Sequence, residues 1–192
     1  IDGAYGGFVY PFSNEKSDIN FNNPKISSIT IDAHKMLQAP YGTGVFICRK
    51  GLIENVLTKE AEYVEGMDLT LCGSRSGANA VAVWMILFTY GPYAWYEKIS
   101  ILMMRTQFLT KELDALGIEY YNCPFMNIVT IKAEFVPENI AHKFGLVPQQ
   151  HNENNKWYKI VLMDHVEVEH LTNFIDEMKT SKNVEKRITT EV

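Results

Sequence analysis

The stretch Ser28-Ile29-Thr30-Ile31-Asp32-Ala33-His34-Lys35-Met36 decides the fold, and it carries a histidine and a lysine side by side. The β-branched residues over 28–31 predict a short strand, and the polar residues after it predict a turn at the rim of a sheet. Partial desolvation at such a rim generally lowers the pKa of an amine and makes it nucleophilic. Upstream, Ile1-Asp2-Gly3-Ala4 places an aspartate at the end of another predicted strand. We therefore expect Asp2 and Lys35 to lie at the ends of neighbouring strands.

A carboxylate and a lysine in this arrangement are what a pyridoxal phosphate site requires. The lysine forms a Schiff base, and the carboxylate keeps the pyridine nitrogen protonated so that the ring can withdraw electrons. The two segments resemble the group II pyridoxal phosphate-dependent amino acid decarboxylases, in particular the short bacterial histidine decarboxylases and the archaeal tyrosine/aspartate decarboxylases. The resemblance implies an α/β chain of the fold-type-I transferase-like class. Residues 1–116 would end the large cofactor-binding domain, and residues 117–192 would form a small C-terminal α/β domain.

The same resemblance implies an activity and a set of site residues. The reaction would convert an aromatic, histidine or acidic L-amino acid to its amine, in a cytoplasmic homodimer with its site at the subunit interface. Lys35 would hold the cofactor, His34 would lie against the ring and its phosphate, Asp2 would pair with the pyridine nitrogen, and Ala4 would pack on the ring. Many relatives have alanine at the position of Gly3, which is a mild departure. A turn aspartate and a solvent-exposed loop lysine are the alternatives for Asp2 and Lys35.

Two further segments carry candidate site residues. Gly73-Ser74-Arg75-Ser76-Gly77 precedes an apolar stretch, so the N–H groups of a helix N-terminus, with Ser74 and Ser76, form a candidate anion site. In the resembling enzymes the matching segment lies near the phosphate of the partner subunit's cofactor, and a helix cap is the alternative. Tyr63 occupies a polar connection where this family places a mobile tyrosine over the site. Its phenol is the candidate acid that protonates the substrate carbanion, unless it simply packs on the surface.

Helical patterns occupy the middle of the chain. The stretch 76–96 has no charged residue, and its continuous apolar part, 80–88, is far shorter than the roughly 18 to 20 residues of a membrane-spanning helix. It predicts a helix buried between other elements. Pro92 and Gly117 fit the first turn and the end of a second helix. Its buried face is predicted from apolar residues and a threonine that recur every three or four positions, namely Trp95, Ile99, Leu102, Thr106, Leu109, Leu113 and Leu116.

The remaining elements alternate between strand and helix. Strands are predicted over 45–48, 118–121, 128–132 and 157–163, and helices over 52–57, 137–144 and through an apolar face from Val168 to Met178. Residues 8–23 and 58–73 are predicted to be loops. This order of elements in the second half favours a small α/β domain that begins between residues 116 and 127.

The composition narrows the class of protein. The net charge is −5 and the basic residues are scattered, so nothing indicates a nucleic-acid interface. Cys48, Cys72 and Cys123 are widely spaced, which indicates a reducing compartment and neither disulfides nor zinc, and the histidines show no metal spacing.

The chain opens inside a predicted strand and without a methionine, so we expect the C-terminal half of a longer polypeptide. The missing half would carry the residues that stack on the ring and bind most of the phosphate. Two rival interpretations are a carbon–carbon lyase that resembles sphingosine phosphate lyase and a non-catalytic fragment.

Overall fold

The computed structural model describes residues 1–56, 75–151 and 154–190, with side chains as far as residue 181. The chain divides into two compact units, Ile1–Glu97 and Lys98–Val192. The predicted domains, 1–116 and 117–192, concern the larger enzyme and stay a prediction. No helix in the described part of the chain combines the length and apolar character needed to cross a membrane.

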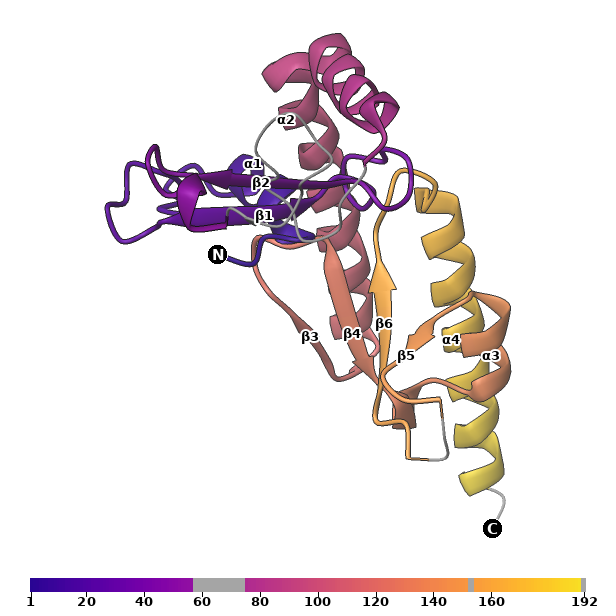
Figure 1. The fold of residues 1–192 in the computed structure, drawn as a ribbon. Helices are drawn as coiled ribbons and strands as arrows, with labels where there is room; N and C mark the ends of the chain where they lie inside the picture. Colours follow the sequence, from indigo (N-terminus) through magenta and orange to yellow (C-terminus); the bar gives the residue numbers. More distant parts are fainter. Residues whose placement is uncertain (57–74, 152–153, 191–192) are drawn as a thin grey trace. The chain divides into compact units, whose positions relative to one another are not determined.

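The N-terminal unit is built on two antiparallel strands, β1 (Ser28–Asp32) and β2 (Gly44–Cys48), both of which the sequence predicts (Figure 1). The segment 1–4 runs parallel to β1 along its other edge, with Asp2 opposite Thr30. The amide of Gly3 donates to the Thr30 carbonyl at 2.9 Å, and the amide of Asp32 donates to the Ala4 carbonyl at 3.0 Å. The expectation that the segment with Asp2 and the strand before Lys35 are neighbours is thereby confirmed.

Short helices follow the first strand end, where a loop is predicted. They are η1 (Gly6–Phe8) and α1 (Tyr10–Ser13), and a further one, η2 (Ile53–Val56), lies after β2. The loop prediction is wrong for the part of 8–23 that lies in these helices, because aromatic packing holds this segment in place. The ring of Phe8 meets the ring of buried Trp95 edge-on, with centroids 4.7 Å apart.

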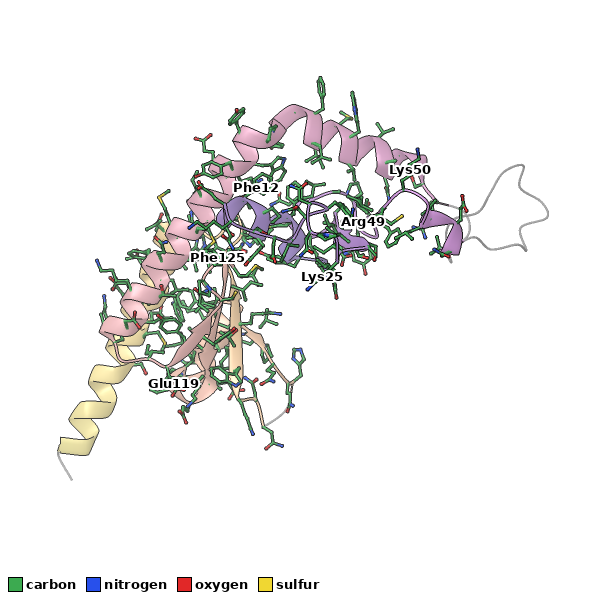
Figure 2. The ribbon with its side chains drawn as sticks, turned by 90° about the vertical axis from the view of Figure 1, so that its left-hand side faces the viewer. Phe12, Lys25, Arg49, Lys50, Glu119 and Phe125 are labelled. Atoms are coloured by element: carbon green, nitrogen blue, oxygen red, sulfur yellow. The ribbon has the colours of Figure 1, made fainter. Side chains whose placement is uncertain are left out.

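Arg49 ties the entrance of β1 to the end of β2. Its guanidinium donates hydrogen bonds to the carbonyls of Ile26 at 2.7 Å, Phe21 at 2.8 Å and Asn23 at 2.7 Å. The guanidinium carbon also lies 5.5 Å from the centre of the Phe21 ring. Arg49 is labelled in Figure 2, together with Lys50, which follows it in the chain.

Helix α2 (Gly77–Ala115) contains both predicted central helices, joined at Gly91, whose φ of 62° and ψ of 177° are not helical. Pro92 follows this break, as expected for the first turn of a new helix. The predicted face of the second helix is confirmed: its residues from Trp95 to Leu113 are buried, and Leu116 after it is partly buried.

Within this chain, the first helix is not buried between other elements, unlike the prediction. Most of its large apolar side chains are exposed. The reason is that its neighbours in the N-terminal unit contact one face only, through Val83 and Ile86.

The C-terminal unit holds a four-stranded antiparallel sheet in the order β3-β4-β6-β5. The strands are β3 (Tyr120–Asn122), β4 (Ile128–Lys132), β5 (Val147–Pro148) and β6 (Trp157–Val161). The helices are η3 (Ala133–Phe135), α3 (Glu138–Lys143) and α4 (Val168–Thr190). Side chains from α2, α3, α4 and one face of the sheet form the core, including Leu109, Leu113, Val129, Ile131, Ile140, Ile160, Phe174, Ile175 and Met178.

Candidate active site

Asp2 lies at the exposed edge of the N-terminal unit, next to β1. Its Oδ1 accepts a hydrogen bond from the amide of Ala4 at 3.0 Å, so the carboxylate closes a turn two residues long. The backbone around it is tightly packed. A Cβ on Gly3 would lie 3.1 Å from the Gly7 Cα and 3.1 Å from the Thr30 carbonyl oxygen. An alanine at the position of Gly3 would therefore need the neighbouring backbone to shift by a few tenths of an ångström.

Lys35 lies in the turn after β1, and its nearest partner is a residue that the sequence analysis did not single out. The Lys35 Nζ lies 2.8 Å from Oδ2 of Asp32, the last residue of β1. The hydrogen bond from Lys35, with smaller contributions from the charges of Lys35 and His34, holds the pKa of Asp32 below its ordinary value, against a partial desolvation that raises it. The spacing of three residues across a turn is the signal that could have identified Asp32.

The expected desolvation of Lys35 is not seen within this chain. Its side chain is 42% exposed and that of Asp32 is 26% exposed. This exposure fits the alternative of a loop lysine as well as that of a cofactor lysine whose site is closed by further protein.

His34 is held by the turn that follows it. Its amide donates to the Thr43 carbonyl at 3.2 Å, and its Nδ1 lies 3.0 Å from the same oxygen. Because a carbonyl only accepts, Nδ1 carries a hydrogen and the opposite nitrogen, Nε2, is left for another partner. The ring lies 5.2 Å from that of Tyr41, which is exposed. The structure thus fixes the orientation of the imidazole before any ligand is present.

The other predicted residues are placed less completely. Ala4 is partly buried beside Asp2, and Ser76 is exposed immediately before α2. Tyr63 and Ser74 lie outside the described residues. The structure therefore places Asp2 and Ala4 along one edge of β1, and His34 and Lys35 in the turn that follows β1.

Other parts of the described structure offer no stronger site. A hollow of about 550 Å³ is lined by Tyr121, Thr130, Trp157, Lys159 and two neighbours, but it belongs to the C-terminal unit and contains none of the predicted residues. Within the described ranges, no group of three His, Cys, Asp or Glu side chains could hold a metal ion.

The sequence of the chain was compared with those of known proteins to identify its relatives. No family model matches the chain. The chain is 55% identical over 179 residues to tryptophan decarboxylase of Clostridium sporogenes. This match covers 93% of the chain and 43% of the relative. It is 32% identical over 200 residues to a probable L-tyrosine/L-aspartate decarboxylase of Methanococcus maripaludis, and this match covers 95% of the chain and 50% of the relative. It is also 31% identical over 187 residues to L-aspartate decarboxylase of Thermococcus kodakarensis, and this match covers 93% of the chain and 48% of the relative.

Solved structures share the fold. A sphingosine-1-phosphate lyase of Burkholderia pseudomallei matches with a TM-score of 0.78 at 16% identity, over 99% of this chain and 47% of the other. Glutamate decarboxylase of Lactobacillus brevis matches with a TM-score of 0.74 at 18% identity, over 95% and 46%. The predicted fold class, the fold shared by the fold-type-I pyridoxal phosphate enzymes, is confirmed.

The chain spans about half the length of the curated relatives it matches. The part matched is their C-terminal half, as the sequence analysis expected. These comparisons confirm the predicted resemblance: the chain is homologous to the group II pyridoxal phosphate-dependent amino acid decarboxylases, over what corresponds to their C-terminal half.

Proposed function

We propose that this chain is the lysine-bearing half of a carboxy-lyase that binds pyridoxal 5'-phosphate and converts an aromatic L-amino acid to its amine. The observation that carries the proposal is the adjacency of the Asp2 and Lys35 segments at the end of β1. The identity of 55% to a tryptophan decarboxylase, against 32% to a probable tyrosine/aspartate decarboxylase, makes tryptophan the first substrate to test.

The residues present fit the cofactor. Asp2 has one carboxylate oxygen bound to the Ala4 amide, and the other has no partner among the described residues, so it can accept from a protonated pyridine nitrogen. Lys35 supplies an amine for the cofactor's carbonyl carbon, and His34 supplies a ring whose Nδ1 is already bonded. When bound, pyridoxal phosphate supplies an electron sink for the negative charge left on the substrate's alpha carbon as carbon dioxide departs.

The chain's own groups would bind, orient and move protons. Asp2 would keep a proton on the pyridine nitrogen, and Asp32 would position the Lys35 amine through its contact at 2.8 Å. His34, held by the Thr43 carbonyl, would present a fixed imidazole face beside the ring. Tyr63 would deliver a proton to the alpha carbon, which makes the amine the product.

We extend the proposal to a cytoplasmic homodimer with its site at the subunit interface. Ser74 and Ser76 would bind the phosphate of the cofactor held by the partner subunit. The exposed position of Ser76 and Arg75 directly before α2 supports this assignment. Cys48 and Cys123 are free thiols, which supports a reducing compartment.

The first experiment tests the cofactor lysine. The chain is incubated with substoichiometric pyridoxal phosphate, reduced with borohydride and mapped by mass spectrometry. We expect phosphopyridoxyl label on Lys35 well above that on Lys25, an exposed lysine of the same unit. Lys35→Arg should abolish the preference and Lys25→Arg should preserve it. Equal labelling of the two lysines in the wild-type chain contradicts the assignment of Lys35.

The second experiment tests the reaction. The chain, combined with the half that it lacks relative to its relatives, is supplied with pyridoxal phosphate and L-tryptophan. We expect tryptamine and carbon dioxide in equal amounts. An aldehyde formed from a phosphorylated amino alcohol would identify the lyase instead, and the absence of any product with a labelled Lys35 would identify a non-catalytic fragment.

A further inference from the structure

Asp32 and Lys35 are joined twice, once through the backbone and once through their side chains. The amide of Lys35 donates to the Asp32 carbonyl at 3.0 Å, which closes the turn after β1. The Nζ of Lys35 lies 2.8 Å from Oδ2 of Asp32. Because the backbone bond already holds the two residues together, their side chains meet without ordering any other part of the chain. The ion pair is therefore built into the turn that carries the candidate cofactor lysine.

Asp32 is the charged group with the most direct hold on Lys35. Within the described ranges, it is the one carboxylate that forms a salt bridge with this lysine. The charge of the neighbouring His34 acts in the same direction on Asp32 but contributes less than the hydrogen bond from Lys35. Asp2, the other acid of the candidate site, has its Oδ1 bound to the amide of Ala4. The charge of Lys35 is therefore stabilised mainly by Asp32.

The charged form of Lys35 is the wrong form for attaching the cofactor. An ammonium group has no lone pair, so Lys35 must first release a proton to solvent before its nitrogen can add to the carbonyl carbon of pyridoxal phosphate. The carbonyl oxygen then leaves as water. A carboxylate at 2.8 Å stabilises the ammonium form more than the neutral amine. The residue that holds Lys35 in place therefore also opposes its reaction.

We propose that the Asp32–Lys35 ion pair is a gate on cofactor uptake, which keeps the lysine in its unreactive, charged form at neutral pH. This inference deepens the proposed function and rests on it for the role of Lys35. The two side chains are 26% and 42% exposed, so water screens the pair and keeps the gate weak. Removal of the negative charge of Asp32 should therefore speed attachment about two- to fivefold and not by orders of magnitude.

The test measures how fast a phosphopyridoxyl label forms on Lys35. The chain is mixed with substoichiometric pyridoxal phosphate, samples are reduced with borohydride at intervals, and the label on Lys35 and Lys25 is quantified by mass spectrometry. We expect Asp32→Asn to accelerate the labelling of Lys35 about two- to fivefold near neutral pH and to leave Lys25 unchanged. The gain should shrink as the pH passes about 10.4, the ordinary lysine pKa, because most of the amine is then neutral in both proteins.

Two further variants and a second aldehyde separate the gate from other effects. Asp32→Glu keeps the negative charge and should return the rate toward that of the wild-type chain. Asp18→Asn makes the same change at an exposed aspartate of the same unit and should leave the rate unchanged. Pyridoxal, which lacks the phosphate, should show the same gain in Asp32→Asn. A gain confined to pyridoxal phosphate would mean that Asp32 repels the phosphate, which overturns the proposal.

An unchanged or slower rate of Lys35 labelling in Asp32→Asn also overturns the proposal, since the carboxylate would then position the amine without opposing its reaction. In that case preferential labelling of Lys35 over Lys25 in the wild-type chain still supports the proposed function. Equal labelling of the two lysines in the wild-type chain overturns the proposed function and the gate with it. The two failures are therefore distinguishable.

Discussion

Replacement of Arg49 by methionine should loosen the segment that leads into β1. Methionine keeps most of the aliphatic stem but removes the three hydrogen bonds, of 2.7 to 2.8 Å, to the carbonyls of Phe21, Asn23 and Ile26. Hydrogen bonds to charged groups contribute about 1.5 to 3 kcal/mol each when sheltered, but Arg49 is only partly buried and water replaces part of what is lost. Taking about 0.7 kcal/mol for each bond, the free energy of local opening falls by about 2 kcal/mol. The equilibrium constant of local opening then rises about 30-fold.

Amide hydrogen exchange measures this local opening directly. The reporters are the amide of Ile26, which donates to Asn23, and the amide of residue 49, which donates to Ser27. Both should exchange about 30-fold faster in Arg49→Met. Lys50→Met is the matched control, since it removes the neighbouring exposed charge and should change neither rate by more than about twofold.

Two results would refute the reasoning about Arg49. The first is a change of less than threefold at both reporter amides, which would mean that water satisfies the three carbonyls as well as the guanidinium does. The second is an equal acceleration of the Leu162 amide, which bonds to Asn127 in the C-terminal unit. That result would indicate general unfolding rather than release of one segment.

Gly91→Ala should destabilise the chain by about 1 to 3 kcal/mol in thermal denaturation, although a Cβ there meets nothing within 4 Å, because its φ of 62° and ψ of 177° suit glycine alone. Gly44→Ala, equally free of neighbours, should cost less, and an equal loss would contradict the backbone argument. Leu113→Ala should cost about 2 to 5 kcal/mol in urea unfolding, since the side chain is fully buried; a loss below 1 kcal/mol would show that the core refills the space. Asp32 should titrate below its ordinary pKa in carboxyl-carbon NMR and return toward it in Lys35→Met, because the hydrogen bond from Lys35 is the main cause of its lowered pKa. That stabilisation is present above the pKa of the unfolded carboxyl and is lost as pH falls through the lower, folded value; an unchanged titration in Lys35→Met would exclude the ion pair as its cause.

The sequence predicted the second half of α2 well, because seven residues at helical spacing share one apolar face, part of which packs into the core of the C-terminal unit. It also predicted β4 with its observed bounds, since the consecutive β-branched residues from Ile128 to Ile131 favour a strand. The two-residue strand β5 was missed because Val147 and Pro148 show no pattern of their own and become a strand only by pairing with β6.

The candidate site was predicted in part. Asp2, His34 and Lys35 were singled out because their residue types stand at strand ends, where side chains are exposed to a ligand, and their roles in a site stay predictions. Asp32 was missed as the partner of Lys35, since its contact depends on how the turn folds back over three residues. Tyr63 and Ser74 stay predictions, because they lie outside the described residues.

The amino-acid sequence by itself determined the strand ends, the lysine beside the histidine and the amphipathic helix, because these depend on residue type and on spacing along the chain. Only the tertiary structure decided that Asp2 and Thr30 are neighbours, that Gly3 is pressed against β1, and that the apolar stretch before Gly91 is exposed on one side. Hydropathy records how much an apolar side chain gains from burial, whereas the three-dimensional arrangement determines whether anything in the same chain is there to bury it.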